Sequence, residues 1–230
     1  MNELRRDVSE GCKVVETAIA KGPPRIHERA PDFTAHSTLG EISLNDFEGR
    51  WLIFFSHPAD FTPVCTTEVI AFAENQQRFR EMGVEILGVS KDSIYSHIAW
   101  LRSIEDKFAI KIGFPILSDP DQAIARLFGM LDEAGDGGIL RTVYVLDPEL
   151  KIRAHLVYPA STGRSVEEIR RLVMALQFAE AKDRVTPEGW KPGDKSILAA
   201  PETWSDAEER ILKNPGNVDW YFTLKDPVRT

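Results

Sequence analysis

Short apolar runs alternate with amphipathic stretches from about residue 26 to residue 181. Residues 51–56 and 84–90 are short, apolar and bounded by turn-forming residues, which predicts two buried parallel strands. Between them, apolar residues recur at helical spacing from Val69 to Phe79, and Gly83 follows the last of them. The pattern therefore predicts a strand–helix–strand unit over this part of the chain.

The same alternation continues toward the C-terminus. A second helix is expected from Ser93, and a third from Asp119, a good N-cap that is followed by proline. Strands are predicted at 142–146 and 152–157, and a capping box at 165–168 precedes a last helix. Strand–helix alternation with a closing pair of strands predicts an α/β or α+β layered domain over residues 26–181.

Both ends of the chain depart from this pattern. Residues 1–25 hold acidic side chains and no apolar core, so we do not expect a targeting signal there. Residues 14–19 place four apolar side chains on one face of a short, marginal helix that ends at Gly22-Pro23-Pro24. Residues 182–230 hold five prolines and three of the five tryptophans. Aromatic residues among prolines predict an extended arm that becomes ordered by packing on something else.

Composition narrows the class of protein. Lys and Arg total 28 against 36 Asp and Glu, a net charge of -8, which disfavours nucleic acid as a partner. The apolar runs are too short to span a membrane. Two cysteines cannot form a disulfide framework. We therefore expect an acidic, cytoplasmic, globular protein whose cysteine chemistry comes from single thiols.

The most informative position is Cys65, between the first predicted strand and its helix. Thr62 is a good N-cap and Pro63 suits the first helical position, so Cys65 is expected third in the helix. Free N–H groups and the helix dipole at that point stabilise a thiolate. The alternative is a small buried hydrophobic residue, and the spacing alone leaves both interpretations open.

The alternatives for a reactive thiol also follow from the sequence. No Cys-x-x-Cys is present, which excludes dithiol exchange of the thioredoxin type. A cysteine hydrolase would need a base, for which His57, His97 and His155 are candidates that the sequence does not place near the thiol.

The string from His57 to Glu68 resembles the active-site signature of peroxiredoxins, with Pro58, Thr62 and Cys65 at the positions that define it. Over its full length the string is similar to the 1-Cys, peroxiredoxin-6-like branch of that family. Further matches run from Ala30-Pro31-Asp32-Phe33 to Trp190-Lys191-Pro192-Gly193-Asp194, so that only residues 1–25 lie outside the resemblance.

This resemblance implies a thioredoxin-like fold, a central sheet flanked by helices, with an extended C-terminal arm. It also implies that the chain reduces hydrogen peroxide and organic hydroperoxides to water and alcohols through a sulfenic acid on Cys65. By the same resemblance, Thr62 contacts thiolate and peroxide, and Pro58 shields the sulfur from water. Arg141 binds the peroxide and stabilises the thiolate.

The resemblance assigns three supporting positions as well. His57 and Arg164 are expected at the substrate, and Glu68 is expected to orient Arg141. We expect no cofactor and no metal. The implied partners are the peroxide and an external thiol reductant, either a thioredoxin-like protein or a small thiol. The arm over residues 182–230 is implied to form a homodimer, and a decameric ring of dimers is the larger assembly that the family allows.

The sequence departs from related branches at two points. Two-cysteine members carry a resolving cysteine, and here the one other thiol is Cys12, in the N-terminal extension. It is either an incidental thiol or an unusual resolving cysteine. No Gly-x-Ser-x-Gly occurs, so a lipase activity is not supported. A chaperone-like or structural redox oligomer, and a cysteine hydrolase, are the competing functions.

Overall fold

A mixed eight-stranded sheet forms the centre of the N-terminal part of the protein. The computed structural model describes residues 13–14, 23–214, 216 and 218–227 and divides into two compact units between Val166 and Glu167. The sheet order is β1-β2-β6-β5-β4-β7-β8, with β3 paired to β2. The strands are β1 (Lys13–Val14), β2 (Phe33–Ser37), β3 (Gly40–Ser43), β4 (Trp51–Ser56), β5 (Val84–Ser90), β6 (Ile116–Ser118), β7 (Arg141–Leu146) and β8 (Ile152–Tyr158).

The central strands confirm the predicted strand–helix–strand unit. Strands β4, β5 and β6 are parallel to one another, and β7 joins β4 in the antiparallel sense. Helix α2 (Pro63–Glu81) connects β4 to β5, and Gly83, at φ +69°, turns the chain after it. Helix α3 (Ile94–Phe108) connects β5 to β6, and the Ser93 side chain caps it by accepting from the Ser96 N–H.

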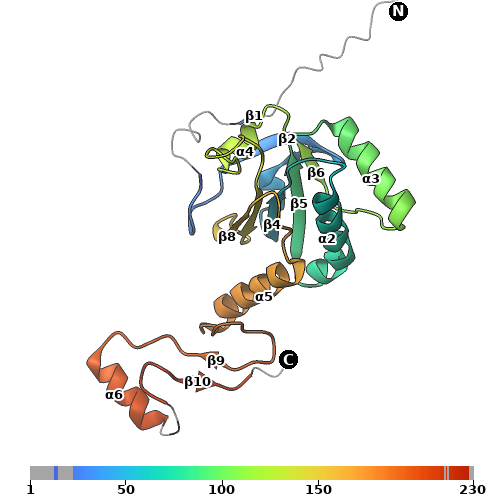
Figure 1. The fold of residues 1–230 in the computed structure, drawn as a ribbon. Coiled ribbons are helices and arrows are strands. Elements are labelled where there is room, and N and C mark those ends of the chain that lie inside the picture. The colour runs from blue at the N-terminus through green and yellow to red at the C-terminus, as the bar shows by residue number, and fades with distance from the viewer. Residues whose placement is uncertain (1–12, 15–22, 215, 217, 228–230) are drawn as a thin grey trace, which may run out of the picture. The chain divides into compact units, whose positions relative to one another are not determined.

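Alternate residues of β4 pack into two separate apolar layers. Phe54 lies against Phe33 and Phe128, with ring centroids 5.5 and 5.0 Å away, in the cluster that also contains helix α4 (Ala123–Leu127). Phe55 points to the other face, where it stacks on Phe72 of α2 at 4.4 Å. Figure 1 shows α2 and α3 beside one face of the sheet and α4 beside the other. The sheet is therefore covered on both faces, as its continuous apolar strands predict.

The predicted start of the third helix was wrong. Helix α4 begins at Ala123, later than Asp119. The Asp119 carboxylate reaches forward instead and accepts from the N–H groups of Ile124 and Ala125, at 3.1 and 2.8 Å. In the N-terminal extension, Lys13 and Val14 form strand β1 against β2. Of the helix predicted over residues 14–19, Val14 is therefore in a strand, and the rest lies outside the described residues.

The second unit contains α5 (Val166–Lys182), β9 (Ser196–Ile197), α6 (Trp204–Lys213) and β10 (Leu224–Lys225). Helix α5 begins directly after Ser165, as the capping box predicts. Inside this unit the buried Trp190 lies 4.6 Å from the Phe178 ring and its carbonyl accepts from Arg171. Strands β9 and β10 pair antiparallel. The domain boundaries at 25/26 and 181/182 stay predictions.

Candidate active site

Cys65 is the third residue of α2, as predicted. Thr62 occupies the N-cap with extended backbone (φ -105°, ψ 147°), and Pro63 opens the helix. The first helical bond runs from the Thr66 N–H to the Thr62 carbonyl, so the N–H groups of the first turn have no helical partner. The Cys65 side chain is buried. The sulfur therefore lies at the positive end of the helix dipole, away from bulk water.

In the loop between β4 and α2, one residue has a backbone conformation that is rare for residues other than glycine. Phe61 has φ +54°, in the left-handed region, and its ring is exposed. Such strain is common at functional sites because surrounding contacts enforce it. The Thr62 hydroxyl does not cap α2; it donates to the Ala59 carbonyl at 2.8 Å. Its oxygen lone pairs are thereby directed as acceptors, which suits a ligand that carries an O–H group. Pro58 lies half-buried in the same loop.

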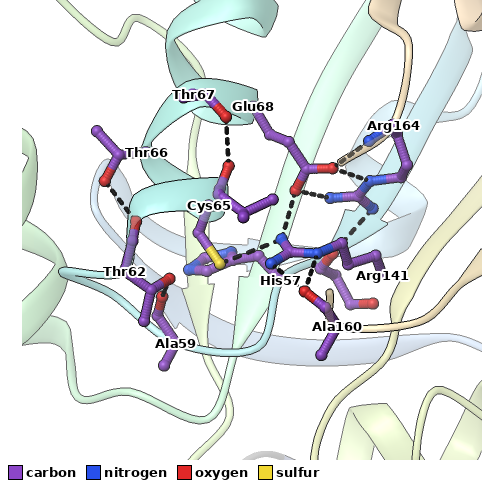
Figure 2. A network of polar contacts seen from close by, with 12 residues as sticks. His57, Ala59, Thr62, Cys65, Thr66, Thr67, Glu68, Arg141, Ala160 and Arg164 are labelled. Carbon is purple, nitrogen blue, oxygen red and sulfur yellow. Dashed lines mark hydrogen bonds and ion pairs between the residues drawn. The ribbon is translucent and has the colours of Figure 1, made fainter. Parts of the chain in front are cut away.

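Arg141, the first residue of β7, brings a cation to the sulfur. Its Nη1 donates to Cys65 Sγ at 3.3 Å and to Glu68 Oε2 at 2.7 Å. Its Nε and Nη2 donate to the Ala160 carbonyl at 2.9 and 2.7 Å. The guanidinium plane is therefore fixed at both ends, with one nitrogen on the thiol (Figure 2).

Glu68 holds Arg141 and Arg164 together. Its Oε1 accepts from the Nε and backbone N–H of Arg164, at 2.8 and 2.7 Å, and its Oε2 accepts from Arg164 Nη2 at 2.8 Å. Arg164 Nη1 also donates to the carbonyls of Ser56 and Thr142. Figure 2 shows both guanidinium groups reaching the one carboxylate. Glu68 thus contacts Arg141 and Arg164 at the same time.

The charges of the buried group beside Cys65 do not cancel. Two guanidinium cations and one carboxylate leave one net positive charge beside Cys65, and the side chains of the three are almost fully buried. Burial acts to raise the pKa of Glu68, but the hydrogen bonds and charge of Arg164, followed by the charge of Arg141, hold that pKa below its usual range. Glu68 is therefore ionised at neutral pH, and a thiolate on Cys65 would bring the group to neutrality.

The three histidines proposed as bases have different surroundings. His57, directly after β4, is buried and lies 3.0 Å from Asp60 through Nε2. His97 is buried in α3 and contacts the same carboxylate. His155, in β8, stacks on the Tyr144 ring at 4.2 Å. Sequence reasoning missed Asp60, because a single acidic residue in a loop gives no signal that it contacts His97, 37 residues away.

One group of described residues has the composition of a metal site. Ligand atoms of His57, Asp60 and His97 lie within 4.8 Å of one another. Each contact within the group has the length of a hydrogen bond, and His97 Nε2 faces the Leu117 carbonyl at 3.1 Å. We therefore describe it as a hydrogen-bonded group. Cys12 lies outside the described residues, and no helix among those described is long and apolar enough to cross a membrane.

Comparisons with known proteins show which family the chain resembles. The model of the AhpC/TSA family matches residues 26–155, and the model of the C-terminal domain of 1-Cys peroxiredoxin matches residues 175–214. A curated relative named peroxiredoxin 2, from Picrophilus torridus, is 47% identical over 200 residues, which is 87% of this chain and 98% of that protein. A peroxiredoxin of Methanosarcina mazei is 44% identical over 213 residues, 88% of this chain and 97% of the relative.

Two solved structures resemble the fold. The yeast mitochondrial 1-Cys peroxiredoxin, studied for thiol resolution through glutathione and thioredoxin systems, aligns with a TM-score of 0.78 at 35% identity, over 88% of this chain and 99% of that one. A cysteine-to-serine mutant of peroxiredoxin 6 from Arenicola marina aligns with a TM-score of 0.79 at 28% identity, over 90% of this chain and 99% of the other.

Proposed function

The chain belongs to the AhpC/TSA family of peroxiredoxins and is a thiol-dependent peroxidase, and we propose that Cys65 is the thiol that attacks the peroxide. In the proposed step the Cys65 thiolate bonds to one oxygen of the O–O bond, and that bond breaks. The products are a sulfenic acid on Cys65 and an alkoxide or hydroxide, which takes a proton to become an alcohol or water.

A single observation carries this proposal: Arg141 Nη1 lies 3.3 Å from Cys65 Sγ while Glu68 and Ala160 hold the rest of the guanidinium. A cation fixed beside the sulfur favours the thiolate before reaction. The same cation stabilises the negative charge that moves onto the leaving oxygen as the O–O bond breaks. Arg141 thus acts before the proposed step, on the thiolate, and during it, on the leaving oxygen.

The neighbouring side chains have proposed roles at the substrate. The Thr62 oxygen, whose hydrogen is donated to the Ala59 carbonyl, contacts the bound peroxide. Pro58 shields the sulfur from water, and His57 contacts the bound peroxide. Arg164 acts through Glu68, which supports its assignment as an anchor of the site more than as a direct ligand.

Stopped-flow kinetics test the proposal. Reduced protein is mixed with hydrogen peroxide and, separately, with an organic hydroperoxide, and oxidation of Cys65 is followed before any reductant is added. We expect a fast second-order reaction with both peroxides, and blocking by prior alkylation of Cys65. Fast alkylation of Cys65 combined with no reaction toward either peroxide would favour a cysteine hydrolase.

Replacing Arg141 with alanine is expected to slow the oxidation of Cys65 by about 10²-fold, the usual cost of removing one fixed transition-state donor. Arg141→Lys should recover only part of the rate, because an ammonium keeps the charge but not the fork that holds Ala160 and Glu68. Arg102→Ala, at an exposed arginine of α3, is the matched control and should react like the wild type. A wild-type rate in Arg141→Ala would remove this residue from the site.

We also propose that an external thiol recycles the sulfenic acid. Cys65 is the one free cysteine among the described residues, so the thiol that attacks the sulfenic sulfur comes from outside that region. A thioredoxin-like protein or a small thiol such as glutathione fits this role, and a reducing compartment, the cytoplasm, supplies both. Turnover with each reductant in turn distinguishes them.

The second unit exposes many large apolar side chains. Helix α6 has no buried residue, and large apolar side chains are exposed on and after it: Trp204, Ile211, Leu212, Val218 and Tyr221. Water-exposed apolar surface of this extent marks an interface. We propose that it forms the homodimer, on which a decameric ring could be built.

Changing Leu212 to glutamate should weaken this dimer by about tenfold or more, because one large apolar side chain contributes roughly 1.5–3 kcal/mol on burial. Light scattering over a dilution series measures the change. Glu208→Gln, on the same helix, is the control. A wild-type protein that is monomeric at every concentration would contradict the dimer.

A further inference from the structure

A buried carboxylate that the proposed reaction does not use, Asp60, lies between two imidazole rings. Its Oδ1 is 3.0 Å from His57 Nε2, and its Oδ2 is 2.9 Å from His97 Nδ1. The three side chains are 0–1% exposed. They come from two segments: His57 and Asp60 lie in the loop between β4 and α2, and His97 is in the first turn of α3.

The surroundings of His97 determine where its protons lie. Its Nε2 is 3.1 Å from the Leu117 carbonyl, which can only accept, so this nitrogen carries a hydrogen. Its Nδ1 faces the Asp60 carboxylate. Burial acts to raise the pKa of Asp60, but the hydrogen bonds from His57 and then His97 outweigh burial and lower it to about 2. Asp60 is therefore ionised, and in its contacts with the two imidazole rings it can only accept.

The protonation of His57 follows from that of Asp60. Because the carboxylate accepts, His57 Nε2 must donate. Burial lowers the pKa of His57, against the hydrogen bond and charge of Asp60, and the charges that face the ring are Asp60, His97 and Asp92. A neutral imidazole has one hydrogen, so His57 Nδ1 is a bare acceptor. It is buried and has no hydrogen-bond partner in the described part of the chain.

This unpaired acceptor lies close to the start of α2. The His57 ring is 5.2 Å from the Trp100 ring, and the Trp100 indole N–H donates to Thr66 Oγ1 at 3.2 Å. Thr66 directly follows Cys65 in the first turn of the helix. Native proteins rarely leave a buried acceptor without a donor, because the lost hydrogen bond to water costs free energy. A donor that is present only during the reaction explains why His57 Nδ1 has no partner in this structure.

We propose that Asp60 and His97 are positioning residues that hold His57 in its Nε2–H form, so that Nδ1 stays free to accept the O–H hydrogen of the peroxide. The proposal rests on the function proposed above for Cys65. His57 gains and loses no proton in this arrangement. Its hydrogen bond orients the oxygen that the thiolate attacks, while the S–O bond forms and the O–O bond breaks as already described.

Nitrogen-15 NMR of the histidine-labelled full chain tests the protonation pattern directly. Spectra of His57→Gln and His97→Gln assign the two signals, and the exposed His36 serves as the reference for an imidazole in water. We expect hydrogen on Nε2 alone for His57 near neutral pH. Hydrogen on His57 Nδ1 would overturn the proposal, and this measurement on the wild type needs no activity.

Two variants of Asp60 separate positioning from folding. In Asp60→Asn, the amide oxygen can accept from His57 and the amide nitrogen can donate to a neutral His97, so the rate of oxidation by peroxide should stay close to the wild type. Asp60→Leu has a similar size and no acceptor. It should mix the His57 tautomers and lower the peroxide rate by about five- to tenfold, the size of one hydrogen bond.

Alkylation of Cys65 by iodoacetamide is the control reaction, since that reagent carries no O–H group for His57 to accept. The alkylation rate should be unchanged in Asp60→Leu. An equal loss in both reactions would show that Asp60 only supports the loop, and a wild-type peroxide rate would remove it from the mechanism. Stoichiometric zinc in the purified protein that disappears in Asp60→Leu would make the group a metal centre and overturn the proposal. Failure of the Cys65 assignment itself would appear separately, as a wild type that peroxide does not oxidise.

Discussion

The Cys65→Ser protein is expected to reduce peroxide no faster than background, a loss of about 10³-fold or more. A serine hydroxyl stays protonated beside Arg141, so the anionic nucleophile disappears although the side chain is nearly the same size. The serine hydroxyl also cannot form a stable counterpart of the cysteine sulfenic acid. The measurement is peroxide consumption in the presence of a thiol reductant, at matched protein concentration.

The other cysteine supplies the matched control for this variant. Cys12→Ser should leave the first oxidation of Cys65 intact, because Arg141, which Glu68 holds in place, contacts the Cys65 thiol. Rapid turnover by Cys65→Ser would show that the reaction occurs elsewhere. Loss of turnover with an intact first oxidation in Cys12→Ser would identify Cys12 as the resolving thiol.

Glu68→Gln is expected to cost about 3–5 kcal/mol of stability, the usual result of removing one partner from a buried ion pair. The substitution leaves Arg141 and Arg164 buried without the carboxylate that both contact. Urea denaturation measures the free energy of unfolding. Glu74→Gln, at an exposed position of the same helix, should stay within about 0.5 kcal/mol of the wild type.

The same residue gives the protein an acid-sensitive component of stability. The ordinary pKa of Glu68 is 4.5, and the folded value lies below it. A lowered carboxyl pKa stabilises the fold above pH 4.5, and this contribution is lost as the pH falls through the folded pKa. The wild type should therefore lose more stability than Glu68→Gln on acidification below pH 4.5. Equal loss in both proteins would contradict the role given to the buried Glu68 carboxylate.

The position of Cys65 could be predicted because its determinants are local. An apolar strand, Thr62, Pro63 and the periodic apolar residues of α2 lie in one short stretch, and the structure confirms that helix start. The hydrogen bond of the Thr62 side chain could not be predicted in the same way. Its hydroxyl can bond either to the N–H groups of the helix or to the Ala59 carbonyl, and the conformation of the loop places it on Ala59.

Contacts between residues that are far apart in the sequence could not be predicted from the spacing of residue types along the chain. Arg141 and Arg164 reach Glu68 over 73 and 96 residues, and only the resemblance to peroxiredoxins placed them together. The pairing of His97 with Asp60 spans 37 residues and follows from how α3 packs. The start of the short helix α4 was predicted too early, because Asp119 reaches its N–H groups from outside the first turn.

The central claim, that a single thiol at Cys65 reacts with peroxide, is tested most directly by intact-mass and peptide analysis after one equivalent of hydrogen peroxide. The account predicts the gain of one oxygen atom per chain, trapped by a sulfenic-acid reagent on the peptide that contains Cys65. A protein that instead loses two hydrogens, with Cys12 and Cys65 joined in one peptide pair, would contradict the one-cysteine reaction. An unmodified Cys65 would contradict the account as a whole.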